Sequence, residues 1–313
     1  MQLSDFTRNL TKEAKEGLFD PPIGRDNVIN DVFRILSQEG KSNALIIGDA
    51  GVGKTNIVEG LAYWIANQKV PPDFKKDEII ELNITQLNSG AMYVGQFEER
   101  VTKFLNEMVA NPRTMVFIDE IHMIMGFGAT SNSNASRDFS QIIKPFLARG
   151  SISVIGATTR QEYKRYIEND SAFNRRFELI DLPELDVDST YQILKRISIK
   201  YKLRKGLEFT ESTLKNIVEV SKSSLPSRFQ PDKSIDILKR CVRKYDTRIS
   251  NNSTRKSDKI DDYIDHLNTQ LKLIQIEDYK RVIKTTKDWL GVIDKEAVQL
   301  NLSLSEINDL LKK

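Results

Sequence analysis

Residues 44–55 read Ala44-Leu45-Ile46-Ile47-Gly48-Asp49-Ala50-Gly51-Val52-Gly53-Lys54-Thr55. Four apolar residues predict a buried strand, and the next eight fit the phosphate-loop pattern G-x-x-x-x-G-K-[ST]. Glycines let backbone N–H groups approach phosphate oxygens closely at the start of a helix. Lys54 can then reach the β- and γ-phosphates, and the Thr55 hydroxyl can ligate Mg²⁺. We therefore predict that residues 48–55 bind ATP with Mg²⁺; the alternative, a chance glycine loop, is disfavoured by the strand–loop–helix context.

Short apolar runs alternate with amphipathic stretches over the first two-thirds of the chain. The runs cover residues 44–47, 78–82, 115–118 and 152–155, with a possible fifth at 177–180. Amphipathic stretches lie between them at 57–66, 97–109 and 139–147. This alternation predicts an α/β fold with a mostly parallel sheet, covered by helices on both faces.

The pattern changes after Pro183, and from Asp188 onward it predicts helices only. Leu214, Ile217 and Val218, for example, recur at helical spacing. We therefore expect a large nucleotide-binding α/β domain at 1–182 and a small all-helical domain at 183–247. Residues 248–313 would form a polar linker and a charged helical tail.

Composition limits the classes of protein and partner. The chain has 313 residues, 39% of them hydrophobic, and 47 basic against 44 acidic side chains give a net charge of +3. This near balance gives no argument for nucleic acid or an anionic membrane as the partner. One cysteine excludes an internal disulfide, and two histidines make a histidine metal cluster improbable. With no apolar signal core and no long apolar run, a reducing, cytoplasmic compartment is expected.

Two carboxylates follow the strand predicted at 115–118. Ligands bind at the carboxyl ends of strands in such sheets, so Asp119 would hold the Mg²⁺ shell and Glu120 would orient the attacking water. A solvated acidic turn is the alternative. Thr159 lies at the end of the next predicted strand, where a hydroxyl could sense the γ-phosphate, although threonine is common there.

Arg175 and Arg176 are adjacent and precede the fifth run. They could be a solvated pair. The functional interpretation is a pair of arginine fingers that neutralise transition-state charge in the site of another subunit, which requires an oligomer.

These elements, in this order, resemble the AAA+ ATPases, and in particular the first ATPase module of the Clp-type unfoldases. The resemblance extends over residues 5–245 and rests on several segments besides the phosphate loop. They are Asp20-Pro21-Pro22-Ile23-Gly24-Arg25-Asp26, Gly95-Gln96-Phe97-Glu98-Glu99-Arg100, Gly156-Ala157-Thr158-Thr159, Arg175-Arg176-Phe177 and Pro231-Asp232-Lys233-Ser234-Ile235-Asp236.

The resemblance implies further roles. Pro22, Ile23, Ile193 and Pro231 would lie near the adenine, the last two from a helical lid. Residues Met92, Tyr93, Val94 and Gly95 fall where the family carries its first pore loop, whose aromatic side chain grips extended polypeptide by packing. A half-buried tyrosine is the alternative. Met92 and Val94 replace basic residues that are usual in the family, which would weaken or tune this grip.

The function implied is ATP hydrolysis by a ring-forming homo-oligomer, expected to be a hexamer, that threads polypeptides through a central pore. No second phosphate loop occurs in the sequence, which motivates an alternative: a single-module regulator that co-assembles with a full-length Clp subunit. A DNA-acting loader is a third hypothesis, supported only by a basic run at residues 195–205. A solvated helix face explains that run equally well.

Overall fold

The structure is a computed structural model that describes residues 3–38, 42–88, 94–125, 139–249 and 298–300. The chain divides into two compact units, Met1–Glu184 and Leu185–Lys313, and each is described by itself. Among the described helices, none is both long and apolar enough to cross a membrane.

The first unit is built on a six-stranded sheet in the order β1-β3-β4-β5-β2-β6. The pairings that join β3, β4, β5, β2 and β6 are all parallel, as the alternation of strands and helices predicted. Strand β1 pairs antiparallel with β3 and was not predicted. The strands are β1 (Thr7–Asn9), β2 (Ala44–Ile47), β3 (Glu78–Leu82), β4 (Thr114–Ile118), β5 (Ser153–Thr158) and β6 (Glu178–Asp181).

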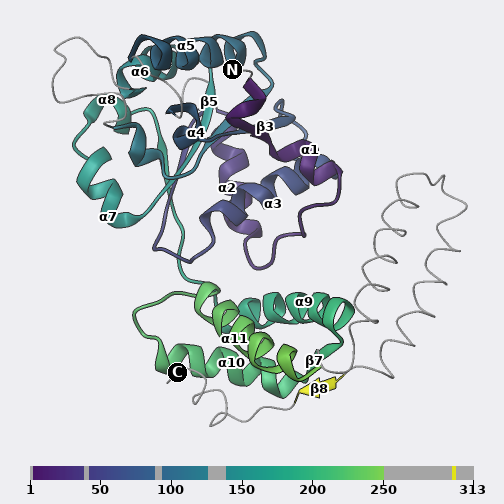
Figure 1. Cartoon of the computed structure of the whole chain (residues 1–313). Coiled ribbons are helices and arrows are strands. Elements are labelled where there is room, and N and C mark those ends of the chain that lie inside the picture. Colours follow the sequence, from purple (N-terminus) through teal and green to yellow (C-terminus); the bar gives the residue numbers. More distant parts are fainter. Residues whose placement is uncertain (1–2, 39–41, 89–93, 126–138, 250–297, 301–313) are drawn as a thin grey trace, which may run out of the picture. The chain divides into compact units, whose positions relative to one another are not determined.

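Helices cover both faces of this sheet (Figure 1). Helices α1, α2 and α3 pack together on one face, and α5 and α6 pack together on the other. Within the first unit the helical elements are η1 (Leu3–Asp5), α1 (Leu10–Lys15), α2 (Asp26–Leu36), α3 (Lys54–Ala66), α4 (Ile84–Asn88), α5 (Val94–Ala110), η2 (Ile121–Ile124), α6 (Phe139–Arg149), α7 (Arg160–Glu162), η3 (Tyr163–Ile167) and α8 (Ser171–Asn174).

Alternation along β4 explains why both faces can be covered. Val116 and Ile118 point into the core shared with α5 and α6, where Phe104 and Phe139 are fully buried. Every residue of β4 is buried. A central parallel strand is apolar on both sides for this reason, and the apolar runs of the sequence mark such strands.

The second unit contains α9 (Val187–Lys205), β7 (Leu207–Phe209), α10 (Glu211–Ser224), α11 (Asp232–Ile249) and β8 (Val298–Leu300). Its core is formed by side chains at the predicted helical spacing, including Leu194, Leu214, Ile217 and Leu238. The expectation of helices only is wrong in one respect, because β7 and β8 form a parallel two-stranded pair. Gly206, at φ 62°, ends α9 and lets the chain enter β7 directly.

The close packing of Gly48 gives a test of this fold. A Cβ atom there would lie 2.8 Å from the backbone oxygen of Leu182 and 2.9 Å from a Val52 methyl group. We expect Gly48→Ala to lower the free energy of unfolding by about 1–3 kcal/mol, since backbone must shift to admit the methyl group. Urea denaturation followed by circular dichroism measures this.

The matched control is Gly95→Ala, because a Cβ atom at Gly95 meets nothing within 4 Å. Because alanine favours a helix over glycine by up to about 1 kcal/mol, the free energy of unfolding of Gly95→Ala should stay unchanged or rise. Equal stability of the two variants would contradict the packing described around Gly48.

Candidate functional site

The candidate site lies at the carboxyl edge of three adjacent strands. Strand β5 pairs with β4 on one side and with β2 on the other, and all three run parallel. The residues that follow them therefore meet at one edge: Gly48 after β2, Asp119 after β4 and Thr159 after β5. This adjacency brings the predicted phosphate loop, carboxylates and threonine together.

The phosphate loop is shaped by two glycines with left-handed backbone. Gly51 has φ 88° and Gly53 has φ 95°, values that other residues rarely adopt. Gly53 is the N-cap of α3, so the N–H groups of the first turn of that helix face the loop. A helix N-terminus of this kind favours a bound anion such as phosphate.

The ammonium group of Lys54 is buried within the loop. Its Nζ atom donates to the backbone oxygens of Gly48, at 3.0 Å, and Asp49, at 3.3 Å. The side chain is therefore held over the loop, with its positive charge beside two of the loop's backbone oxygens. This geometry suits the binding of a polyphosphate.

A direct hydrogen bond joins the loop to the end of β4. The Thr55 hydroxyl donates to Asp119 Oδ2 at 2.7 Å, and the backbone N–H of Glu120 donates to Asp119 Oδ1 at 3.0 Å. A hydroxyl and a carboxylate are oxygen ligands of the kind that Mg²⁺ takes. The two side chains therefore fit the metal that accompanies ATP, and either oxygen could enter its coordination shell.

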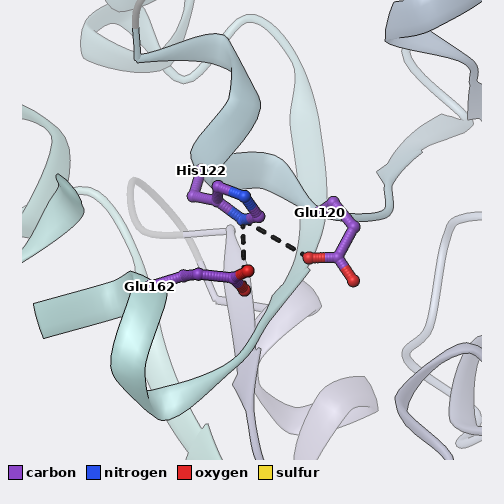
Figure 2. Close-up of side chains that lie close together, drawn as sticks. All are labelled: Glu120, His122 and Glu162. Carbon is purple, nitrogen blue, oxygen red and sulfur yellow. Dashed lines mark ion pairs between the residues drawn. The ribbon is translucent and has the colours of Figure 1, made fainter. Parts of the chain in front are cut away.

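Glu120 lies beside this pair with its backbone in the left-handed region, at φ 50°. Its Oε2 atom accepts no hydrogen bond from any residue that the structure describes, and it lies 3.4 Å from His122 Nδ1 (Figure 2). Burial raises the pKa of Glu120, and the charges of Glu162 and Asp119 raise it further. A carboxylate with a raised pKa in such a place suits a group that accepts a proton from water.

Thr159 begins α7 as part of a capping box. Its hydroxyl donates to Glu162 Oε2 at 2.6 Å, and the backbone N–H of Glu162 donates back to it at 3.2 Å. Thr158, which is fully buried, contacts His122 Nδ1 through its hydroxyl at 3.0 Å. From the sequence, no role in the site was assigned to Thr158, His122 or Glu162. The T-x-x-E spacing of Thr159 and Glu162 was the signal that could have drawn attention to Glu162.

The two arginines bond to backbone oxygens in their own neighbourhood. Arg175 Nε donates to the oxygen of Ser171 at 2.9 Å, and Arg176 Nη1 donates to the oxygen of Ala148 at 3.0 Å. Arg175 is exposed at the end of α8, close to the edge strand β6. The structure thus groups both arginines at a surface of the unit, while their role in another subunit's site remains a prediction.

A buried arginine that the site prediction did not include supports the phosphate loop. Arg25 Nη2 donates to the backbone oxygens of Val52 and Pro183, both at 2.9 Å. Nearby, Pro22 packs against α3, since a Cβ atom on Gly60 would lie 3.0 Å from Pro22 Cβ. Arg25 therefore anchors the loop to the chain segment that follows β6.

The structure describes only some of the residues predicted to contact the adenine or to form the pore loop, and it divides the adenine set between the two units. Pro22 and Ile23 are half-buried in the first unit, whereas Ile193 on α9 and Pro231 before α11 belong to the second unit. Met92 and Tyr93 lie outside the described residues. Val94 and Gly95 begin α5, and Gly95 is exposed. Both sets of roles stay predictions.

Comparison with known proteins agrees with this arrangement. Residues 44–181 match the model of the "ATPase family associated with various cellular activities (AAA)", and residues 186–288 match an AAA lid domain. A relative from Staphylococcus aureus strain USA300, the ATP-dependent Clp protease ATP-binding subunit ClpL, is 40% identical over 99% of this chain and 42% of its own length. The ClpL of the bovine strain RF122 / ET3-1 is 43% identical over 75% of this chain and 34% of its own length.

Solved structures show the same likeness. The Hsp104–ADP complex of Saccharomyces cerevisiae has a TM-score of 0.72 and 34% identity, over 92% of this chain and 49% of its own. The extended Hsp104–casein complex of the same yeast has a TM-score of 0.69 and 36% identity, over 80% of this chain and 42% of its own. The chain thus spans less than half the length of these relatives.

The contact between Thr55 and Asp119 predicts a metal-dependent effect on nucleotide affinity. Thr55→Val keeps the shape of the side chain but removes the hydroxyl, so we expect ATP affinity in the presence of Mg²⁺ to fall about tenfold or more, as when a buried charged group loses a hydrogen-bond partner. Thr55→Ser, which keeps the hydroxyl, should bind like the unaltered protein. Titration with a fluorescent ATP analogue, with Mg²⁺ and with EDTA, measures both.

The EDTA arm decides whether the hydroxyl acts through the metal. An equal loss of affinity with and without Mg²⁺ would show that Thr55 serves the loop structure and not the metal.

Proposed function

Because this chain belongs to the AAA family of ATPases and resembles its Clp-type members, we propose that it hydrolyses ATP within a homo-oligomeric ring and uses that energy to remodel proteins. The observation that carries the proposal is the meeting of Lys54, the Thr55–Asp119 pair and Glu120 at one edge of the sheet. A nucleotide-binding module with no turnover would need the first three of these residues but not a second carboxylate beside them.

The chain's own residues divide the work. The N–H groups of the loop and Lys54 hold the phosphates, and Thr55 with Asp119 would hold Mg²⁺. When bound, Mg²⁺ neutralises charge on the phosphate oxygens. Glu120 orients the attacking water and draws its proton, and Thr159 contacts the terminal phosphate from the neighbouring strand end. Positioning and charge stabilisation of this kind account for most of the acceleration in phosphoryl transfer.

Arg175 and Arg176 are proposed to complete the site of the adjacent subunit. The exposed position of Arg175 at the end of α8, with the half-buried Arg176 next to it, supports this, because a finger must leave its own chain to reach the partner's phosphate. The terminal guanidinium nitrogens of Arg175 carry donors beyond the one that Nε gives to Ser171, so charge remains available for another oxyanion. Hydrolysis would then require a ring, for which six subunits are proposed.

Polypeptide is the proposed substrate of the ring. The segment at residues 92–95, with Tyr93 as the aromatic side chain, would grip an extended chain by packing without reading its sequence. The solved Hsp104 assembly was captured with casein, a protein substrate, which supports the same class of substrate for this chain. Association with a Clp protease partner is a further proposal, supported by the name of the ClpL relatives.

Glu120→Gln tests the proposed base. Glutamine keeps the size and position of the side chain but cannot accept a proton, so kcat should fall about 10²–10⁴-fold while ATP binding stays within twofold. Phosphate release measures kcat, and a fluorescent nucleotide measures binding. Asp188→Asn, on the other unit, is the matched control and should leave both unchanged. Unaltered hydrolysis by Glu120→Gln would show that another group activates the water.

Mixed oligomers test whether the arginines act in trans. Glu120→Gln subunits lack the base but supply arginines, and Arg175→Ala/Arg176→Ala subunits lack the arginines but supply the base. Each should be nearly inactive alone, whereas a mixture should recover hydrolysis, because some interfaces then hold a complete site. Size-exclusion chromatography with a slowly hydrolysed ATP analogue confirms assembly. A mixture no more active than its parts, or a chain that stays monomeric with nucleotide, would contradict the proposed ring.

A further inference from the structure

We propose that His122 is a positioning residue for Glu120: a proton on its Nδ1 atom orients the Glu120 carboxylate, and Glu162 and Thr158 hold the imidazole in place. The proposal deepens the proposed function and rests on it for its catalytic meaning. It concerns a cluster of three side chains from the ends of β4 and β5, shown in Figure 2.

The surroundings of His122 Nδ1 determine which nitrogen carries the proton. Three oxygens face this atom: the Thr158 hydroxyl at 3.0 Å and one carboxylate oxygen each from Glu120 and Glu162, both at 3.4 Å. Carboxylates only accept hydrogen bonds, so a bare nitrogen facing two of them would be repelled. The Nδ1–H tautomer is the neutral form that satisfies this site.

Glu162 is the fixed side of the cluster. Its Oε2 atom accepts three hydrogen bonds: from the Thr159 hydroxyl at 2.6 Å, from the Thr159 backbone N–H at 3.2 Å and from the Thr158 hydroxyl at 3.4 Å. Burial alone would raise the pKa of Glu162, but the hydrogen bonds from Thr159, together with the effects of His122 and Glu120, leave the pKa below its ordinary value. Glu162 is thus a carboxylate with a set orientation, against which the imidazole can be aligned.

A neighbouring aromatic ring sets the plane of the imidazole. Tyr166 stacks on His122 with ring centroids 5.6 Å apart and planes 20° apart. Tyr166 lies on η3, the π-helical turn that directly follows Glu162. One short stretch after β5 therefore supplies both the carboxylate that aligns His122 and the ring that limits its rotation. Such π-turns are frequent at functional sites.

Glu120 is the side of the cluster that needs orienting. Its side chain is 45% exposed, against 16% for His122, and it has no hydrogen bond to fix its Oε2 atom among the residues that the structure describes. A loosely held base costs rate, because misplacement of a reacting group by about 1 Å can lower kcat about 10²-fold. A proton shared from His122 also separates the like charges of Glu120 and Glu162, which otherwise oppose each other.

Three substitutions of His122 test the role of Nδ1. His122→Asn places an amide N–H near the Nδ1 position, His122→Gln places it near Nε2, and His122→Ala removes it. We expect kcat for ATP hydrolysis to fall about tenfold or more in the Ala and Gln variants and to stay within about threefold in the Asn variant. Nucleotide affinity should stay within twofold in all three, since His122 is not proposed to contact ATP.

A merely structural histidine would give another pattern. Equal kcat for the Asn and Gln variants, full activity of the Ala variant, or a fall in affinity that accounts for the fall in rate would each overturn the proposal. If the Ala variant does not fold, as judged by circular dichroism, the Asn and Gln pair still decides, because both are polar and of similar size.

Nuclear magnetic resonance of the unaltered full chain tests the tautomer without hydrolysis. The chain has two histidines, so protein labelled with ¹⁵N-histidine gives two sets of ring signals, and His122→Asn identifies one of them. We expect the Nδ1–H tautomer at neutral pH, changed by Glu162→Gln. The Nε2–H tautomer would overturn the proposal even if the chain hydrolyses ATP. Conversely, a chain that shows Nδ1–H but no hydrolysis would refute the proposed function and leave the position of the proton on His122 established.

Discussion

The parallel pairing of β2, β5 and β4 is the constraint on which the site depends. Strands that run in one direction end at one edge, so three segments distant in the sequence deliver their polar residues to the same place. The register is fixed by burial, because a slip of one residue would turn Ile118 and Val116 out of the core shared with α5 and α6. Hydrophobic packing thus sets the distance between Thr55 and Asp119, although neither side chain belongs to the core.

Repulsion between like charges is the second factor that shapes the site, because the fold brings several carboxylates close together. Asp119, Glu120 and Glu162 gather within one edge, and burial together with their mutual repulsion raises the pKa of Glu120. Lys54 offsets part of this, as do the N–H groups at the start of α3. The hydroxyl of Thr159 donates a hydrogen bond to Glu162 Oε2, and the Nδ1 atom of His122 lies 3.4 Å from Glu120 Oε2. Functional sites commonly combine close charges and partial burial in this way.

Much of this could be predicted from the sequence, for identifiable reasons. The central strands are apolar on both faces, and residues 48–55 carry a pattern that phosphate binding itself requires. Strands β1 and β7 escaped prediction because three residues, such as Thr7-Arg8-Asn9, are too few to show a period. Glu162 was missed because its partners Thr158 and His122 meet it only after β4 and β5 pair. Roles that need a second subunit or the other unit cannot be derived from one folded domain.

The strained backbone of Glu120 shows how core packing reaches the chemistry. A non-glycine residue at φ 50° costs about 1–3 kcal/mol, so something must hold it there. Ile121 and Ile124, which follow it in η2, are fully buried and fix the path of the chain. Ile121 fits because β5 carries Gly156 opposite it, where a Cβ atom would lie 2.7 Å from the Ile121 methyl group. A glycine in a central strand, weak as a strand former, thus admits the isoleucine that turns Glu120 toward the site.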